Sequence, residues 1–415
     1  MPQGWQRDRL KDQVRLAYGE SLAAEDRVDG NIKVFGSNGE VGYHNVAITR
    51  GPTIIIGRKG SFGKVTWTGR SCFPIDTTYF VDCTQTHENL RWLYYALGNL
   101  DLDTVNFDSA VPGLSREVAY SLYLLYPPRS EQQRIATYLD ESCAAIDAAV
   151  AAKRRQIETL DGVRKDVIQQ TVTSGLETNP VLSRTGNVWM PQVPSTWELV
   201  NLKRISEIQT GLTLGKVYGG RLIERPYLRV ANVQDGHLDL AEVTTIEVPE
   251  DVARRVTLRV GDVLMTEGGD LDKLGRGTIW NGEIGDCLHQ NHIFAIRCFR
   301  HKLLPTFLAY LTASQYGRDY FEATGKRTTN LASTSSKKVG MFPIPRPPLD
   351  EQERICLFLD EKVSQIGRIQ AGIQSQIDTL TAYRKSLIHE CVTGQRRITD
   401  PDVRRLKANI NIDVA

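Results

Sequence analysis

The sequence Pro127-Pro128-Arg129-Ser130-Glu131-Gln132-Gln133-Arg134-Ile135 returns 220 residues later as Pro347-Pro348-Leu349-Asp350-Glu351-Gln352-Glu353-Arg354-Ile355. Aligned at this offset without a gap, residues 127–173 and 347–393 are identical at 20 of 47 positions. Unrelated segments do not agree at that level. The chain therefore contains two similar halves, and its function must explain why it needs both.

Each copy of the repeat predicts one long helix. A Pro-Pro pair cannot lie inside a helix and marks its beginning. Ser130 with Gln133, and Asp350 with Glu353, are expected to form capping boxes at the two starts. Each helix is expected to hold about 45 residues, or roughly 65 Å at 1.5 Å per residue.

Apolar residues recur every seven positions along both predicted helices, as in a coiled coil. Neither helix has a core of its own, so we expect the two to pack on each other, antiparallel. The expected packing positions are Leu139, Ile146, Leu160 and Val167 in the first copy, and Leu359, Ile366, Ile373, Leu380 and Leu387 in the second.

A weaker apolar series runs through Ile355, Ile369 and Tyr383. Several residues conflict with long, regular helices, because a mid-helix glycine costs about 1 kcal/mol relative to alanine. A break or bend is therefore expected near them. The conflicting residues are Lys153 on the first seam and Gly162, Gly367 and Gly372.

A globular region precedes each long helix, and both regions open with the motif Pro-x-x-Trp-x4-Leu, at residues 2–10 and 194–202. Turn-separated runs rich in β-branched and aromatic residues indicate strands in both regions. The strands are expected at 45–49, 53–56, 64–67 and 77–81, followed by a helix at 87–97, and then at 227–233, 243–248, 262–266, 277–280 and 293–298.

The expected fold class is α+β: two α/β domains separated by two long antiparallel coiled-coil helices, with a pseudo-twofold internal repeat. The C-terminal tail is basic and expected to be loosely ordered. The expected segments are a first globular domain (1–126), a helical spacer (127–176), a connector (177–193), a second globular domain (194–346), a second spacer (347–395) and the tail (396–415).

Composition is that of an ordinary globular protein, with 41% hydrophobic and 24% charged residues among 415. Seven scattered cysteines without a C-x-x-C pair favour reduced thiols, and no apolar run suits a signal peptide or a membrane span, so a cytoplasmic location is expected. The net charge of +2 does not by itself indicate nucleic-acid binding. Any DNA-binding potential must therefore be local.

The stretch Gly57-Arg58-Lys59-Gly60-Ser61-Phe62-Gly63-Lys64 resembles a P-loop but has five residues between the outer glycines and no Ser or Thr after the lysine. Two interpretations remain: a hairpin turn with solvated charges, or a Gly-rich loop that brings cations to a phosphate or a base edge. A second Gly/basic loop at 268–277 occupies the corresponding place. The candidate DNA-binding residues of the two loops are Arg58, Lys59, Ser61, Lys64, Lys273 and Arg276.

Two further stretches of the second half carry candidate DNA contacts. The side chains of Gln290 and Asn291 suit bidentate contact with adenine, although a polar turn before a strand is about as good an interpretation. Lys326 and Arg327 lie in a basic loop, of which 110–116 is the looser counterpart. The segment 287–292 holds a cysteine and two histidines, but no second cluster completes a zinc site, so no metal is expected.

Catalytic motifs are mostly absent. The Pro-Pro pairs follow Tyr126 and Arg346, whereas an amino-methyltransferase site has Asn or Asp there. There is no Rossmann glycine motif opening a helix and no nucleophile elbow. The only lysine two residues after an acid, as in a nuclease D/E-x-K, is Lys362, inside a predicted spacer helix.

Two copies of Pro-Pro-x-x-Glu-Gln-x-x-Ile-x3-Leu-Asp, each after a divergent region opening with Pro-x-x-Trp-x4-Leu, resemble the specificity subunit of type I restriction–modification systems over nearly the whole chain. The resemblance implies two target recognition domains, each reading half of a bipartite, asymmetric site on double-stranded DNA. It also implies helices that set the spacing and bind two methyltransferase subunits, with restriction/motor subunits joining them.

The same resemblance implies that this chain has no active site and no cofactor of its own. S-adenosylmethionine would be bound by the methyltransferase, which methylates adenine N6. An alternative is a coiled-coil scaffold or adaptor whose globular ends bind proteins and not DNA. A third possibility is a self-contained enzyme with unfamiliar motifs, for which nothing in the sequence gives direct support.

Overall fold

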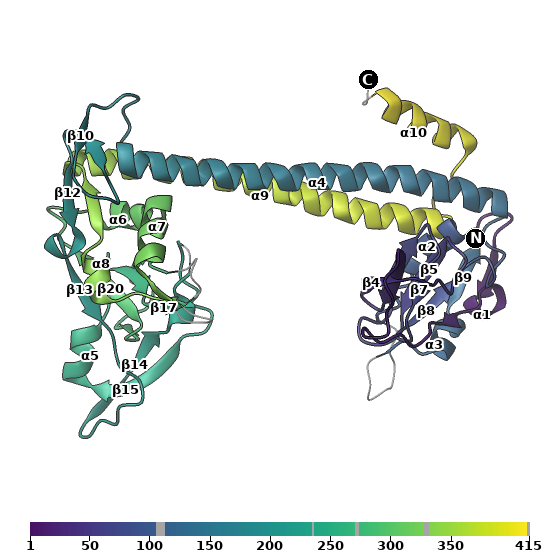
Figure 1. The fold of residues 1–415 in the computed structure, drawn as a ribbon, viewed down its shortest axis with the longest axis horizontal. Coiled ribbons are helices and arrows are strands. Elements are labelled where there is room, and N and C mark those ends of the chain that lie inside the picture. The colour runs from purple at the N-terminus through teal and green to yellow at the C-terminus, as the bar shows by residue number, and fades with distance from the viewer. Residues whose placement is uncertain (105–112, 235, 270–273, 328–331, 413–415) are drawn as a thin grey trace. The chain divides into compact units, whose positions relative to one another are not determined.

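The structure is a computed structural model, and it describes residues 1–104, 113–234, 236–269, 274–327 and 332–412. The chain divides into two compact units, and each contains one globular region and a part of both long helices (Figure 1). Unit 1 comprises Met1–Arg154 with Ile373–Ala415, and unit 2 comprises Arg155–Gly372.

Unit 1 is built on a four-stranded antiparallel sheet in the order β2-β8-β5-β6. A second sheet, β4-β3-β7, combines an antiparallel with a parallel pair, and β1 pairs with β9. The elements are β1 (Gln6–Arg9), α1 (Leu10–Gln13), β2 (Ala17–Tyr18), β3 (Ile32–Gly36), β4 (Gly39–His44), β5 (Thr53–Gly57), β6 (Val65–Thr68), β7 (Phe73–Pro74), β8 (Thr78–Val81), α2 (Leu90–Gly98), α3 (Arg116–Ser121) and β9 (Tyr123–Tyr126).

Unit 2 repeats this topology: β13-β20-β16-β18 matches the four-stranded sheet, β15-β14-β19 the three-stranded one, and β12-β23 the outer pair. Its matching elements are β12 (Glu198–Asn201), β13 (Ser206–Thr210), β14 (Leu222–Leu228), β15 (Thr244–Pro249), β16 (Val263–Thr266), β18 (Gly277–Ile279), β19 (Leu288–His289), β20 (Ile293–Cys298), α6 (Pro305–Ala313), α8 (Ser336–Gly340) and β23 (Pro343–Arg346).

The longer second half adds elements to the shared plan. A small sheet, β17-β22-β21, lies beyond the four-stranded one. The additions are β10 (Leu182–Arg184), β11 (Gln192–Pro194), η2 (Val230–Asn232), α5 (Glu250–Val256), β17 (Gly268–Gly269), α7 (Gln315–Thr324), β21 (Lys326–Arg327) and β22 (Ala332–Ser333). The short helix η1 (Leu202–Arg204) follows β12 as α1 follows β1. The repeat read from the helices thus extends to the topology of both units.

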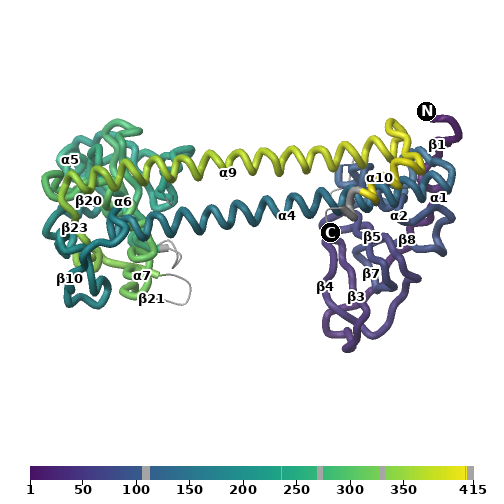
Figure 2. The backbone as a smooth tube through the Cα atoms, turned by 90° about the horizontal axis from the view of Figure 1, so that it is seen from above, coloured from purple at the N-terminus to yellow at the C-terminus, as the bar shows by residue number. Residues whose placement is uncertain are grey.

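The two long helices are α4 (Arg129–Ser174) and α9 (Leu349–Val392). In unit 1, Arg384 of α9 pairs with Asp147 of α4 at 3.0 Å. In unit 2, Gln370 donates to the side chain of Asp161 at 3.1 Å. The paired residue numbers rise along α4, from Asp147 to Asp161, and fall along α9, from Arg384 to Gln370. The predicted antiparallel pairing of the two helices is therefore confirmed (Figure 2).

Every residue of the first seven-residue series is buried or half-buried, whereas two of the three residues of the weaker series are exposed. Ile355 of the weaker series is buried, but Ile369 and Tyr383 are about half exposed, so this part of the prediction is wrong. On the main series, Leu139, Ile146, Leu359, Ile366 and Leu387 are buried, while Leu160, Val167, Ile373 and Leu380 are half-buried.

The expected break at the mid-helix residues is also wrong, because both helices continue through them. A side chain at Gly162, Gly367 or Gly372 would meet no atom within 4 Å, so these glycines lie on open helix surface. Their propensity cost is small beside the packing of the pair. Lys153 is accommodated because its ammonium donates to the Gln376 side chain on the facing helix.

The glutamine of the duplicated motif explains why the motif occurs twice. Gln132 is buried, donates to the Pro127 carbonyl at 2.9 Å and accepts from the backbone N–H of Asn89 at 2.8 Å. Gln352 is buried, donates to the Pro347 carbonyl at 2.9 Å and accepts from the Leu304 N–H at 2.9 Å. Asn89 and Leu304 are the N-cap residues of α2 and α6.

The aspartate of the motif makes a second repeated contact with the same short helices. Asp140 accepts from the Tyr95 hydroxyl of α2 at 2.7 Å, and Asp360 accepts from the Tyr310 hydroxyl of α6 at 2.6 Å. Glutamine and aspartate together fix each long helix against the helix that covers the four-stranded sheet. The duplicated motif is thus the joint between helix and globular region.

The predicted capping boxes are wrong, since α4 and α9 begin at Arg129 and Leu349, one residue before Ser130 and Asp350. The carbonyl of Pro128 accepts the first helical N–H groups, and that of Pro348 does the same in α9. The side chain of Gln133 instead accepts from Asn89 at 2.7 Å.

The C-terminal segment is not loosely ordered where the structure describes it. Helix α10 (Asp400–Ile412) follows the buried Ile398, and Val403 packs on the core of unit 1. Arg397 pairs with the buried Glu131 at 2.7 Å. The apolar residues between the basic pairs of the tail account for this docking.

One strand prediction failed, because 45–49 is irregular and the chain pairs earlier, in β3 and β4. The Thr49 hydroxyl accepts the Cys72 N–H at 2.9 Å, and the N–H groups of Ile48 and Thr49 donate to the Cys72 carbonyl. These contacts give the backbone of the segment hydrogen-bond partners, although it does not pair with a neighbouring strand. The other expected strands overlap β5, β6, β8, β14, β15, β16, β18 and β20.

Candidate nucleic-acid interface

The Gly-rich stretch of unit 1 is the loop between β5 and β6, which pair antiparallel. The Gly63 N–H donates to the Gly57 carbonyl at 2.9 Å and closes the loop. A side chain at Gly57 would lie 2.2 Å from the Ser61 carbonyl oxygen, and Gly63 has a φ of +78°. Both positions therefore require glycine. No helix follows the loop, which agrees with the rejection of a P-loop.

Backbone contacts bring this loop to the segment that precedes α3. The N–H groups of Arg58 and Lys59 donate to the Thr77 carbonyl at 2.8 and 3.2 Å, and Lys59 bridges to Gly113. The Arg58 carbonyl accepts the Leu114 N–H at 2.8 Å. The Gly-rich loop and the segment before α3 thus lie side by side.

An exposed tyrosine lies within this surface between two arginines. The guanidinium carbons of Arg58 and Arg116 lie 5.1 and 4.8 Å from the ring centroid of Tyr18, which is 45% exposed. The ring of Tyr79 lies 5.1 Å away, and burial, followed by the neighbouring Tyr18, raises the pKa of Tyr79 to about 12. An exposed ring flanked by cations suits a base and its phosphates.

The remaining candidates of the unit 1 loop have different surroundings. Lys59 and Ser61 are exposed. Lys64 is also exposed, but its ammonium donates to the carbonyl and side-chain oxygens of Asn38 at 2.7 and 3.0 Å. Lys64 therefore ties the loop to the β3–β4 turn and is less available to a ligand than Lys59.

Sequence reasoning singled out Arg58 but missed Tyr18, and it treated Arg116 only as part of a loop. Tyr18 is separated from both arginines along the chain, and only the pairing of β2 with β8 places it beside Arg58. A lone tyrosine near a short strand gives no signal of its own in the sequence.

In unit 2, the corresponding basic stretches also meet. Strand β22 pairs with β17 on one side and with β21 on the other. This sheet joins Gly268–Gly269 to Lys326–Arg327, as Lys59 joins Gly113 in unit 1. Lys326 is exposed. The side chain of Arg327 and the whole of Lys273 lie outside the described residues.

The other unit 2 candidates lie on neighbouring turns. Arg276 is half-buried immediately before β18. Gln290 and Asn291 form the turn from β19 to β20, held by donation of their N–H groups to the carbonyls of Leu228 and Leu212 at 2.9 and 2.8 Å. Their side chains are half-buried. Beside this turn, His292 contacts Glu267 at 2.6 Å.

The possible metal ligands of the segment 287–292 have different environments. The Cys287 thiol is buried, and burial raises its pKa to about 12. The ring of His289 is buried against the Val256 carbonyl, at 3.0 Å from Nδ1, and burial lowers its pKa. Among the residues that the structure describes, no three His, Cys, Asp or Glu side chains gather as metal ligands.

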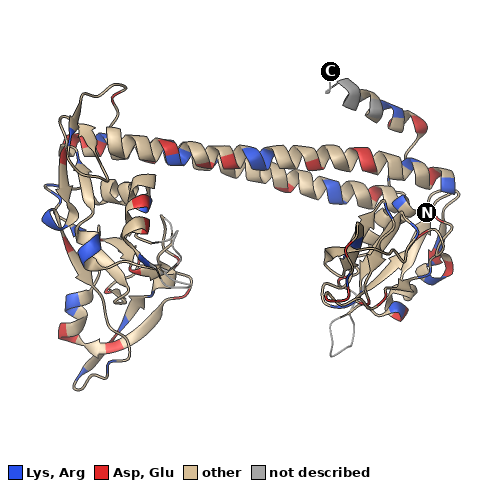
Figure 3. Cartoon of the chain, viewed as in Figure 1, with Lys and Arg blue, Asp and Glu red and all other residues tan. Residues whose placement is uncertain are grey.

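Charge does not gather into a single large patch in the view of Figure 3, where basic and acidic residues alternate along both long helices. Arg58 and Arg116 form one local basic cluster, on either side of Tyr18. None of the described helices is long and apolar enough to cross a membrane.

Comparison with known proteins identifies relatives of one kind. Residues 2–159 match the family described as the type I restriction modification DNA specificity domain. The MjaX specificity subunit of Methanocaldococcus jannaschii, a putative type I restriction enzyme subunit, is 28% identical over 205 residues, which cover 49% of this chain and 47% of that protein. The EcoBI specificity subunit of Escherichia coli is 22% identical over 84% of this chain and 76% of its own length.

Two solved structures share the fold. The HsdS subunit from Thermoanaerobacter tengcongensis has a TM-score of 0.52 at 15% identity, covering 95% of this chain and 98% of its own. A chain from a structure on complex assembly and conformational transition of the type I R-M system has a TM-score of 0.64 at 16% identity, covering 95% and 99%. In sequence and in fold, the chain is therefore similar to the specificity subunits of type I restriction–modification systems.

Proposed function

We propose that this chain is the DNA-recognition subunit of a type I restriction–modification complex. Each unit contributes one reading surface, and each surface binds one half of a bipartite, asymmetric site on double-stranded DNA. In unit 1 this surface is the Tyr18–Arg58–Arg116 cluster with Lys59. In unit 2 it comprises the turn at Gln290 and the β17-β22-β21 sheet.

The observation that carries the proposal is that the two units share one topology but have different side chains on their equivalent loops. The sheets of the two units have the same strand order, and equivalent loops are joined in both. The side chains on these loops differ: an aromatic ring between two arginines in one unit, and amides with a lysine in the other. Two readers of the same construction with different surfaces suit two half-sites of different sequence.

The long helices have two roles in this proposal. They fix the spacing of the two half-sites, and they bind two methyltransferase subunits, which restriction/motor subunits then join. The chain carries no chemistry of its own: S-adenosylmethionine is bound by the methyltransferase, which methylates adenine N6. The protein-binding scaffold is less well supported, because it does not explain why two arginines flank an exposed aromatic ring in unit 1.

Binding of the assembled methyltransferase to labelled DNA tests this function. Arg58→Ala is expected to weaken binding by about 5- to 100-fold, the equivalent of 1–3 kcal/mol for one good contact. Lys59→Ala is expected to weaken binding to all sequences and to reduce the salt dependence. Arg276→Ala and Lys273→Ala are expected to act through the other half-site.

Lys64→Ala is the matched control, because its ammonium is already bound to Asn38. Its effect on DNA affinity should be small beside that of Arg58→Ala. Unchanged affinity in the Arg58, Lys59, Lys273 and Arg276 variants across a salt series would remove these loops from the DNA surface.

A further inference from the structure

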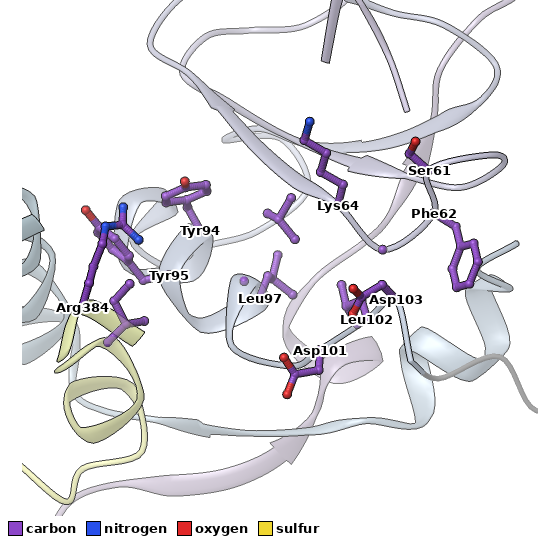
Figure 4. Close-up of a pocket in the computed structure, with 14 residues that line it drawn as sticks. Ser61, Phe62, Lys64, Tyr94, Tyr95, Leu97, Asp101, Leu102, Asp103 and Arg384 are labelled. Atoms are coloured by element: carbon purple, nitrogen blue, oxygen red, sulfur yellow. The ribbon is translucent and has the colours of Figure 1, made fainter. Parts of the chain in front are cut away.

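Each unit has a pocket at the same place in the repeat. The pocket of unit 1 has a volume of about 590 Å³ and lies among α9, α2 and the start of β6 (Figure 4). That of unit 2 has a volume of about 580 Å³ and lies among α4, α6 and β18. Their walls come from different parts of the sequence but from equivalent elements.

The long-helix wall is the same in both pockets. Unit 1 uses Arg384 and Ile388 of α9, and unit 2 uses Arg164 and Ile168 of α4. Both pairs occur in the pattern Leu-x3-Arg-Lys-x2-Ile, at the offset of 220 that relates the two helices. Each wall therefore offers a guanidinium and an apolar side chain one turn further on, and a lysine follows the arginine in both helices.

The second and third walls are also equivalent. Tyr95 and Tyr310 line the two pockets, and each hydroxyl donates to the aspartate of the duplicated motif. Val65 opens β6 and Gly277 opens β18, at matching places in the two sheets. Figure 4 draws the Arg384 and Tyr95 side chains at one end of the pocket and Lys64 and Ser61 at the other.

The two arginines of the shared wall form ion pairs with carboxylates that are partly exposed. Arg384 pairs with Asp147 at 3.0 Å, Arg164 with Asp161 at 3.5 Å, and both carboxylates are more than 40% exposed. Such pairs contribute little, roughly 0–1 kcal/mol. An incoming carboxylate can therefore replace them at low cost.

The rest of each pocket differs between the units. Asp101 and Asp103 line the pocket of unit 1, whereas Leu238 and Glu283 line that of unit 2. Surfaces that read different DNA half-sites should differ throughout. A shared basic and apolar wall suits an occupant that is the same in both units.

We propose that the two pockets hold the same segment of a partner protein that binds this chain in two copies. The segment places a carboxylate against the Arg-Lys pair and an apolar side chain against Ile388 or Ile168. This inference rests on the proposed function, in which the methyltransferase subunit is the partner. The pockets would make docking identical on two units that read different DNA.

Native mass spectrometry of the full chain, purified with its methyltransferase subunit, tests the inference. The wild-type complex should contain two methyltransferase copies. Replacing Arg384 and Lys385 by glutamate should leave one copy, and so should the same changes at Arg164 and Lys165. The four changes together should leave none. Each altered pocket should lose at least tenfold in affinity for its partner.

Pocket-filling variants test the same sites without changing charge. A side chain at Gly98 meets nothing within 4 Å, so Gly98→Phe extends into the unit 1 pocket, and Ala313→Phe does so in unit 2. Each should also remove one copy. The matched control replaces the exposed Arg254 and Arg255 of α5 by glutamate and should retain two copies.

Two copies retained in both the charge-reversed and the filled variants, with unchanged circular dichroism, would overturn the inference. So would a loss of DNA affinity at unchanged stoichiometry, because the pockets would then contact DNA. A wild-type chain that binds no methyltransferase would instead refute the proposed function.

Discussion

Gln352→Met tests whether the motif glutamine joins the long helix to its globular region. Gln352 is fully buried, donates to the carbonyls of Pro347 and Lys302 at 2.9 and 3.0 Å, and accepts the Leu304 N–H at 2.9 Å. Methionine has nearly the same length but makes none of these bonds. The variant therefore leaves three backbone groups without this partner.

Each lost bond is worth about 1 kcal/mol, and more where a buried group stays unpaired. The added apolar surface offsets part of this loss. We therefore expect Gln352→Met to lower the free energy of unfolding by about 3 kcal/mol, in a urea titration at neutral pH. Hydrogen exchange should quicken at the start of α6 and remain unchanged in α2, which Gln132 serves in the other unit.

Gln156→Met is the matched control, since Gln156 is an exposed glutamine of α4 and its change should stay within about 0.5 kcal/mol. A loss below about 1 kcal/mol for Gln352→Met, or faster exchange in α2, would refute the role given to this glutamine.

Three further predictions test other parts of the structure. Gly367→Ala should raise the free energy of unfolding by about 0.5–1 kcal/mol. Gly394→Ala should lower it, because Gly394 has a φ of +74° and an added methyl group would meet Pro2. Urea titration measures both variants, and equal effects would contradict this account. Only Cys83 of the seven free cysteines is exposed, so a maleimide should label one thiol rapidly in the native chain and seven in denaturant, with Cys83→Ser abolishing the rapid phase. Burial lowers the pKa of His289, so below about pH 6.5 the unfolded chain binds a proton that the folded chain does not. The free energy of unfolding should therefore fall as the pH falls, by up to about 1.4 kcal/mol per pH unit. His289→Gln should flatten this slope, and an unchanged slope would exclude His289 as its source.

The helices and their pairing could be predicted because the sequence repeats them. A gapless repeat of 47 residues reports the length of each helix and its apolar positions, such as Leu139 and Leu359. The prediction failed where contacts outside the helix decide the outcome. Ser130 and Asp350 look like caps, but buried contacts of the neighbouring glutamines set the junction, and Pro128 and Pro348 accept the first N–H groups.

The globular regions were predictable in part. Central strands such as β5 and β16 are short apolar runs and were recognised, but β4 contains Gly39 and Gly42 and has little strand signal. The basic loops of each half were found singly. These loops meet in pairs because residues far apart in the sequence pair with each other, such as Lys59 with Gly113. No local sequence pattern indicates such a pairing.

The pairing of two readers on one chain is tested most directly by exchanging one of them. Residues 194–346 would be replaced by the corresponding region of a relative with a different target, in the complete complex. Sequencing of methylated adenines in host DNA should then show one half of the recognised site changed and the other half retained. A change in both halves, or in neither, would contradict the account of two independent readers.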